Sequence, residues 1–280
     1  MPLRYDTFLG SSGGAWVPPP EPEFTPPRAD LLAYWFRAQD ACSDISGTIP
    51  CTNGDPIAFI PNLGVGTSNA IQTTTINRPV FKTGGLNGRS YIECAAASQQ
   101  YFEDIDLTQP SGVASARPRT IIVVTDNINL SDFRAILGST DTNGGKAGLY
   151  FRSPSGAQVH YLKAGFRSRD IVNPQILFAQ NRRGTNPYTE DTYTTAISSA
   201  VYRLNGISTI INNVDNASSV AITATQLLRC TGVAGGGNGY FDGHLYELLI
   251  YDGALNTNVW SEIEAYLMEK YGFVFTPGAF

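Results

Sequence analysis

The chain has 280 residues, a net charge of −5 at neutral pH and only 15% charged residues, whereas glycine, tyrosine and phenylalanine are abundant. This composition favours many short strands joined by turns and disfavours a helical bundle. We expect no nucleic-acid partner, because lysines and arginines form no cluster, and no membrane span, because no apolar run approaches about 18 residues.

The first 28 residues differ from the rest of the chain. Glycine and serine dominate positions 10–14, and a proline-rich run follows. Proline fixes φ and has no N–H, so residues 1–28 are predicted to form an extended arm rather than a helix or a central strand. Phe8, Trp16 and Phe24 are spaced along this arm as candidate anchors for a protein partner.

From residue 29 onward, short apolar and β-branched runs alternate with turns rich in glycine, asparagine and serine. The Ile121–Thr125 run is typical of a strand buried on both faces, and Asn205-Gly206 is a strong hairpin signal. The predicted strands are Leu31–Arg37, Ile57–Ile60, Tyr91–Cys94, Tyr101–Ile105, Ile121–Thr125, Ala135–Leu137, Leu149–Phe151, Val159–Leu162, Ile176–Phe178, Val201–Leu204, Ser208–Ile211, Val220–Thr223, Leu227–Cys230 and Tyr240–Tyr251. So many short strands predict a β-sandwich or jelly roll.

One segment, residues 257–271, has helical periodicity. Asn256 or Thr257 can cap its start, and Gly272 is a stop signal. The apolar stripe consists of Val259, Ile263, Tyr266, Leu267 and Tyr271, with Trp260 beside it. A single helix after so many strands is expected to pack against their sheet as a structural clamp.

The C-terminal region resembles the last long strand and helix of laminin G-like domains. The segment Gly239–Asp252 is followed by Ala254-Leu255 and by the predicted helix, which is the family's pattern. Asn77–Arg89 is similar to the family's connector before its second strand pair, and Leu32–Asp40 to its opening strand. The resemblance spans about residues 30–273. It implies a concanavalin A-like jelly roll over residues 29–280, used for binding or structure without specifying a ligand.

The sequence contains only incomplete sets of the catalytic residues that enzymes of this fold use. The carboxylates of residues 103–106 do not continue the alternating pattern of the β-glucanases of this fold. Gln158–Phe166 resembles two alginate-lyase motifs fused into one run, but neighbours on a strand point to opposite faces, so His160 and Tyr161 cannot act together. His244 is interpreted as a core or edge histidine of its strand. We predict no catalytic residues and no enzymatic activity, with a polysaccharide lyase as the less favoured alternative.

Cysteine spacing indicates no metal site. The four cysteines are interpreted as free thiols, with a Cys42–Cys51 disulfide as the alternative: Cys42, Cys51, Cys94 and Cys230. We predict no cofactor. Calcium stays open as an alternative, because three aspartates lie in or near turns, although their spacing does not make them a set: Asp141, Asp215 and Asp242.

The favoured hypothesis is a non-enzymatic structural or interaction protein. It would be a decoration, cement or fibre component of a phage-like particle, anchored by its arm to capsid or tail proteins or to copies of itself. The alternative is a carbohydrate-binding or adhesion module, for which loop residues Tyr188 and Tyr193 are candidates and the remaining ligand-binding residues are unassigned. The N-terminus lacks a secretory signal, which predicts synthesis in the cytoplasm and then entry into a virion or another extracellular assembly.

Overall fold

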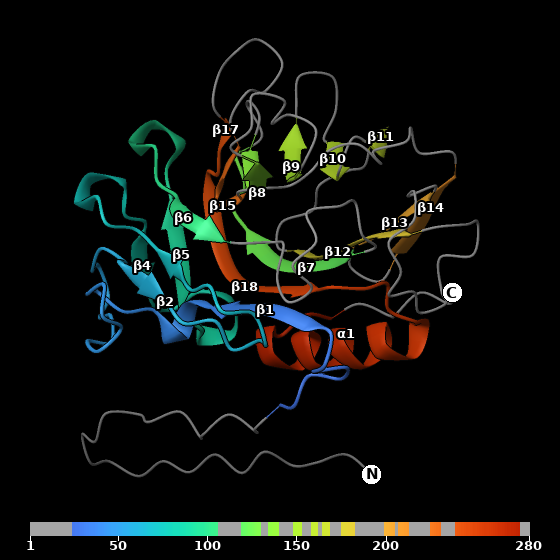
Figure 1. The fold of residues 1–280 in the computed structure, drawn as a ribbon, viewed down its shortest axis with the longest axis horizontal. Coiled ribbons are helices and arrows are strands. Elements are labelled where there is room, and N and C mark those ends of the chain that lie inside the picture. Colours follow the sequence, from blue (N-terminus) through green and yellow to red (C-terminus); the bar gives the residue numbers. More distant parts are fainter. Residues whose placement is uncertain are drawn as a thin grey trace.

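The computed structural model describes residues 24–105, 119–129, 134–139, 148–152, 158–161, 164–168, 175–182, 199–204, 207–212, 225–230 and 239–274. The described residues form two eight-stranded sheets, a two-stranded ribbon and one C-terminal α-helix (Figure 1). The predicted all-β sandwich with a single C-terminal helix is confirmed. Residues 1–23 of the predicted arm lie outside the described residues.

The sheet that carries the helix, called here the helix-side sheet, is antiparallel and centred on β7 and β18. Strand β1 (Leu32–Arg37) pairs with the second half of β18, whereas β5 pairs with its first half. The remaining order is β14 (Ile207–Asn212), β13 (Ser199–Leu204), β12 (Gln175–Arg182), β7 (Arg119–Asp126), β18 (Gly243–Tyr251), β5 (Tyr91–Cys94) and β4 (Val80–Lys82).

The second sheet lies across the core from the helix-side sheet (Figure 1). Its order is β11 (Ala164–Ser168), β10 (Gln158–Tyr161), β9 (Gly148–Arg152), β8 (Arg134–Ser139), β15 (Thr225–Leu227), β6 (Phe102–Ile105), β3 (Ala70–Ile71) and β2 (Phe59–Ile60). The separate ribbon pairs β16 (Arg229–Cys230) with β17 (Gly239–Tyr240). Short 3-10 turns complete the described part of the chain: η1 (Ala38–Asp40), η2 (Thr75–Asn77), η3 (Leu86–Gly88) and η4 (Ala96–Ser98).

Two predicted strands are interrupted by residues whose positive φ is incompatible with extended structure. Leu228 has a φ of +68° and separates β15 from β16, and Gly243 has a φ of +148° at the start of β18. A Cβ at Gly243 would lie 3.0 Å from the Cα of Ile128, so a side chain has no room there. Strands β3, β4 and β11 were not predicted; β3 and β4 have only two and three residues, too few to show alternation. The predicted strand at 220–223 lies outside the described residues.

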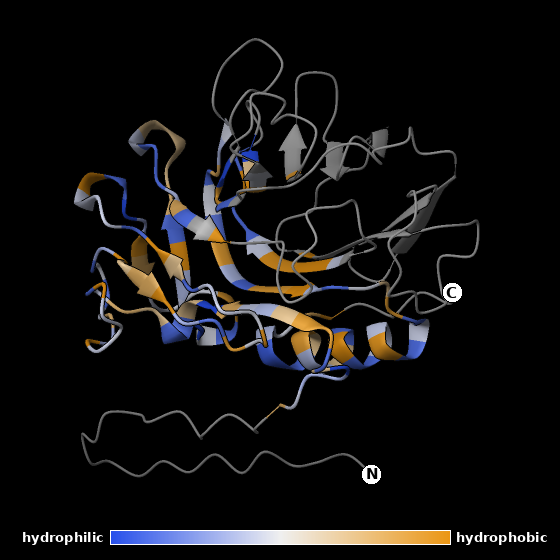
Figure 2. Cartoon of the chain, viewed as in Figure 1, coloured by the Kyte–Doolittle hydropathy of each residue, from blue (hydrophilic) through white to orange (hydrophobic). Residues whose placement is uncertain are grey.

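The central strands contribute to two cores. One side of β7 and β18 faces the second sheet and builds the inter-sheet core with residues such as Ile121, Val123, Leu245, Leu248 and Ile250. The other side faces the helix and builds a second core that includes Ile122, Val124, Leu249, Tyr251 and Trp260. Strand β7 is therefore buried on both faces, as its β-branched run predicts, and Figure 2 shows this apolar colouring along β7, β18 and α1.

The helix α1 (Thr257–Tyr271) has the predicted bounds. The Asn256 side chain accepts hydrogen bonds from the backbone N–H groups of Asn258 and Val259 at 3.0 and 3.1 Å, which satisfies two donors of the first turn. Gly272, with a φ of +70°, ends the helix in the left-handed conformation that glycine adopts at low cost. Within the described residues, no helix is long and apolar enough to cross a membrane.

Candidate functional site

A row of polar side chains lies on the outer face of the helix-side sheet, next to the C-terminal end of α1. We call it the polar row, and it consists of Lys82, Tyr91, Glu93, Asp126 and His244. His244 on β18 is the cross-strand neighbour of Glu93 on β5 and of Asp126 on β7, and Lys82 on β4 is opposite Tyr91. The residues that alternate with them on the same strands belong to the inter-sheet core, so the row faces outward.

His244 is held between the two carboxylates of the row. Its Nδ1 lies 2.5 Å from Oδ1 of Asp126, and its Nε2 lies 3.9 Å from Oε1 of Glu93. The Tyr91 ring packs on the imidazole with 4.2 Å between centroids. The His244 side chain is 16% exposed and that of Glu93 is 42% exposed, so the row is anchored in the sheet and open to solvent at one side.

A second layer of contacts fixes Asp126. The Tyr246 hydroxyl donates to Oδ2 of Asp126 at 3.0 Å and accepts from the backbone N–H of Leu86 at 3.2 Å. Burial, more than any charge, raises the pKa of Tyr246 and that of Tyr91 above the ordinary tyrosine value. Both phenols are therefore neutral at physiological pH and serve as hydrogen-bond donors and ring surfaces, not as anions.

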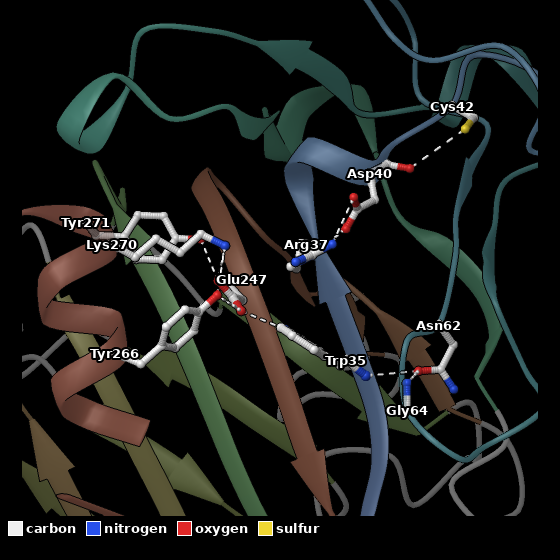
Figure 3. Close-up of polar contacts among 10 residues, drawn as sticks. All are labelled: Trp35, Arg37, Asp40, Cys42, Asn62, Gly64, Glu247, Tyr266, Lys270 and Tyr271. Carbon is white, nitrogen blue, oxygen red and sulfur yellow. Dashed lines mark hydrogen bonds and ion pairs between the residues drawn. The ribbon is translucent and has the colours of Figure 1, made fainter. Parts of the chain in front are cut away.

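A different polar cluster is buried between α1 and the sheet (Figure 3). Oε1 of Glu247 accepts from Trp35 Nε1 at 2.6 Å and from the Tyr266 hydroxyl at 3.4 Å, and Oε2 accepts from the Tyr271 hydroxyl at 2.7 Å and from Lys270 Nζ at 3.1 Å. The side chains of Glu247 and Lys270 are 0% and 3% exposed. Because both oxygens are engaged by protein donors and closed to solvent, this cluster connects helix to sheet and does not present a ligand site.

Among the predicted arm anchors, only Phe24 lies in the described part of the chain. Its ring stacks on Tyr266 of α1 with 3.7 Å between centroids and an interplanar angle of 4°, and it meets the Trp35 ring edge to face at 6.3 Å. Phe24 thus packs on the chain's own helix and first strand. Phe8 and Trp16 lie outside the described residues, and the partner-binding role of the arm stays a prediction.

Replacing Phe24 with alanine is expected to lower the free energy of unfolding by about 1–2 kcal/mol, because it removes two aromatic contacts from the helix-side core. Removal of residues 1–23, which keeps Phe24, serves as the control and should leave the urea unfolding curve unchanged. If Phe24→Ala unfolds like the parent, the stacked ring contributes nothing to stability.

The other sequence-derived candidates are placed as follows. Oδ2 of Asp242 accepts from Asn129 Nδ2 at 3.0 Å and lies 3.6 Å from the Arg134 guanidinium, so protein donors engage this oxygen. Among the residues that the structure describes, no group of three or more His, Cys, Asp or Glu side chains could hold a metal ion. The other calcium and sugar candidates lie outside the described residues: Asp141, Tyr188, Tyr193 and Asp215.

The described cysteines are free thiols. Cys42, Cys51 and Cys94 form no disulfide, so the Cys42–Cys51 alternative is not present in this structure. Burial raises the pKa of Cys51 to about 12, with a smaller contribution from the Asp55 carboxylate. Thiolate is the reactive form, so Cys51 is a poor nucleophile at physiological pH.

The polar row was missed because its residues come from strands that are far apart in sequence. Glu93 is visible in its own strand as a polar residue between the apolar Ile92 and Cys94, whereas Asp126 lies between the polar residues Thr125 and Asn127. What the sequence alone does not supply is the register that aligns Glu93, His244 and Asp126. His244, interpreted from sequence as a core or edge histidine, is the centre of that alignment.

Comparison with known proteins identifies similar folds. No family model matches the chain, and no curated protein matches it significantly. Among solved structures, it is similar to the carbohydrate-binding module (CBM40) of the Ruminococcus gnavus IT-sialidase bound to α2,3-sialyllactose, with 14% identity, a TM-score of 0.40 and coverage of 63% of this chain and 95% of that one. Domain 4 of the Geobacillus stearothermophilus arabinanase AbnA, in complex with arabinotriose, has 16% identity, a TM-score of 0.44 and coverage of 82% and 97%.

A heptameric SAP-like pentraxin from Limulus polyphemus is a further similar structure, with 14% identity, a TM-score of 0.36 and coverage of 52% of this chain and 69% of that one. At these identities the similarity is one of architecture only. The ligands named above are those of the other proteins.

Proposed function

We propose that this protein is a non-enzymatic carbohydrate-binding or adhesion module whose ligand lies along the polar row. The observation that supports the proposal is the row itself, in which an aromatic ring and both hydrogen-bond donors and acceptors share one solvent-facing strip of a rigid sheet. Side chains mounted on strands keep their spacing, so they can match a repeating ligand.

The chemistry of the row suits hydroxyl-rich ligands. Sugar hydroxyls donate and accept hydrogen bonds, and the row offers a partly exposed acceptor at Glu93 and a cationic donor at Lys82. Lys82 Nζ lies 3.5 Å from Oε2 of Glu93, and both side chains are partly exposed. The Tyr91 ring provides an apolar surface for the C–H groups of a sugar ring.

The position of His244 supports binding without hydrolysis. Glycosidases use two carboxylates that face each other across the scissile bond, separated by roughly 5–9.5 Å of space for substrate and water. In the polar row the strand that carries His244 lies between those of Glu93 and Asp126, and its imidazole contacts Asp126 directly. The bond to be cleaved would have no place between the carboxylates.

A glycan array with the full chain, followed by calorimetric titration of the strongest ligand, tests the proposal. Tyr91→Ala and His244→Ala are each expected to weaken binding at least tenfold, because they remove the ring surface and the centre of the row. Glu93→Gln should also weaken binding, whereas Glu262→Gln, the same change at an exposed position of α1, is the matched control and should bind like the parent.

Two outcomes contradict the proposal. One is a folded parent protein that binds no glycan on the array; the other is a bound glycan whose affinity all three row variants leave unchanged. Release of reducing sugar or of unsaturated product from the bound glycan would contradict its non-enzymatic part.

The resemblance to laminin G-like domains agrees with a binding role, since such domains are used for binding or structure. The role in a phage-like particle stays a prediction that rests on the arm. Electron microscopy of candidate particles with an antibody against this chain would test it separately from the glycan measurements.

A further inference from the structure

We propose a second ligand site, formed by Tyr101, Arg229 and Tyr240, that binds the carboxylate of an acidic saccharide. We call these residues the tyrosine–arginine stack. The saccharide part of this inference rests on the proposed function, whereas the carboxylate part rests on the geometry of the stack. The site does not share residues with the polar row.

Three segments bring the stack together. Arg229 on β16 is directly opposite Tyr240 on β17, and Tyr101 immediately precedes β6. The neighbours Leu228 and Phe241 are fully buried in the inter-sheet core. Adjacent residues in extended chain point to opposite sides, so Tyr240 faces away from that core, and Arg229, directly opposite Tyr240, shares its face.

The two rings hold the guanidinium in place. The Arg229 Cζ atom lies 4.6 Å from the Tyr101 ring centroid and 5.4 Å from that of Tyr240, and the rings are 6.3 Å apart. Both distances are typical of cation–π contacts. Because the centroids are only 6.3 Å apart, the two rings lie on neighbouring sides of the guanidinium, and neither takes up its terminal N–H groups as a conventional hydrogen-bond acceptor.

Arg229 has no acidic partner in the described part of the chain. No described carboxylate lies within ion-pair distance of it, and its Nε, shielded from solvent, makes no hydrogen bond. The carboxylate of Glu103 accepts instead from the Tyr101 hydroxyl at 3.4 Å. In a chain of net charge −5, a guanidinium without a counter-charge among the described residues is a position where an anionic ligand can form a favourable ion pair.

The edge of a guanidinium specifies the anion. Nε is closed to solvent, but the two terminal nitrogens of a guanidinium present a pair of parallel N–H groups, which match the two oxygens of a carboxylate in a planar, bidentate pair. The two tyrosine rings beside Arg229 favour a ligand whose carboxylate is attached to a partly apolar body, as in a sugar acid. The stack therefore fits a uronate residue of an oligosaccharide.

Titration of the full chain with trigalacturonic acid and with its fully methyl-esterified form tests this inference. The parent is expected to bind the acid at least tenfold more tightly than the ester, because the ester cannot form the charged pair. Arg229→Gln should abolish that preference, and Arg229→Lys should remove most of it, since lysine keeps the charge but loses the planar fork. Arg28→Gln, the same charge change at a partly buried arginine outside the stack, should retain the preference.

Each other outcome overturns the inference in a recognisable way. If the parent binds acid and ester equally, or if Arg229→Gln keeps the preference while its melting temperature matches the parent, the stack does not bind the carboxylate. Inorganic phosphate that displaces the acid at equal concentration would indicate an unselective anion site. If the preference for the acid is absent but another glycan still binds at the polar row, only this inference fails and the proposed function stands. If neither surface binds any glycan, the proposed function fails as well.

Discussion

Glu247→Gln is expected to lower the free energy of unfolding by about 3–5 kcal/mol, because it removes the carboxylate that forms an ion pair with the buried Lys270 ammonium. Four donors converge on the two carboxylate oxygens of Glu247, two on each. A glutamine has one oxygen and one NH₂ group in place of the two carboxylate oxygens. If the NH₂ group takes the place of Oε1, it meets the donors of Trp35 and Tyr266. If it takes the place of Oε2, it meets those of Tyr271 and Lys270. Charge loss and donor repulsion therefore act in the same direction.

Urea unfolding of Glu247→Gln, of Lys270→Met and of the double variant measures the effect. The double variant should recover part of the stability lost in Glu247→Gln, because it removes the buried ammonium as well. Glu262→Gln provides the control for a charge change on the exposed side of the same helix. An unfolding free energy of Glu247→Gln within about 1 kcal/mol of the parent would show that the buried pair does not connect α1 to the sheet.

The position of Glu247 also explains a limit of prediction from sequence. In β18, strict alternation would place Glu247 on the same face as Leu245, inside the inter-sheet core. The register between β18 and β7 shifts between Leu245 and Glu247, so that the intervening Tyr246 is an extra residue. This bulge puts both Tyr246 and Glu247 on the helix side, where the donors of α1 and β1 meet the carboxylate.

Features specified by local sequence were predicted well. The helix was located by its cap, its apolar stripe and its final glycine, all within 256–272, and β7 by its run of β-branched residues. Features specified by pairing between distant segments were not predicted. The polar row needs the register of four strands, the Glu247 cluster needs a bulge, and the tyrosine–arginine stack needs a two-residue ribbon joined to a loop before β6.

Trp260→Ala is expected to lower the free energy of unfolding by about 3–5 kcal/mol, because the side chain is 1% exposed and is among the largest in the core between α1 and the helix-side sheet. Ile263→Ala, one turn further along the same face, should cost about 2–5 kcal/mol. Ser261→Ala lies between them on the exposed side and is the matched control, with an expected change within about 0.5 kcal/mol. Chemical denaturation monitored by far-ultraviolet circular dichroism gives all three values. If Trp260→Ala and Ile263→Ala unfold at the same urea concentration as Ser261→Ala, α1 is not packed on the sheet.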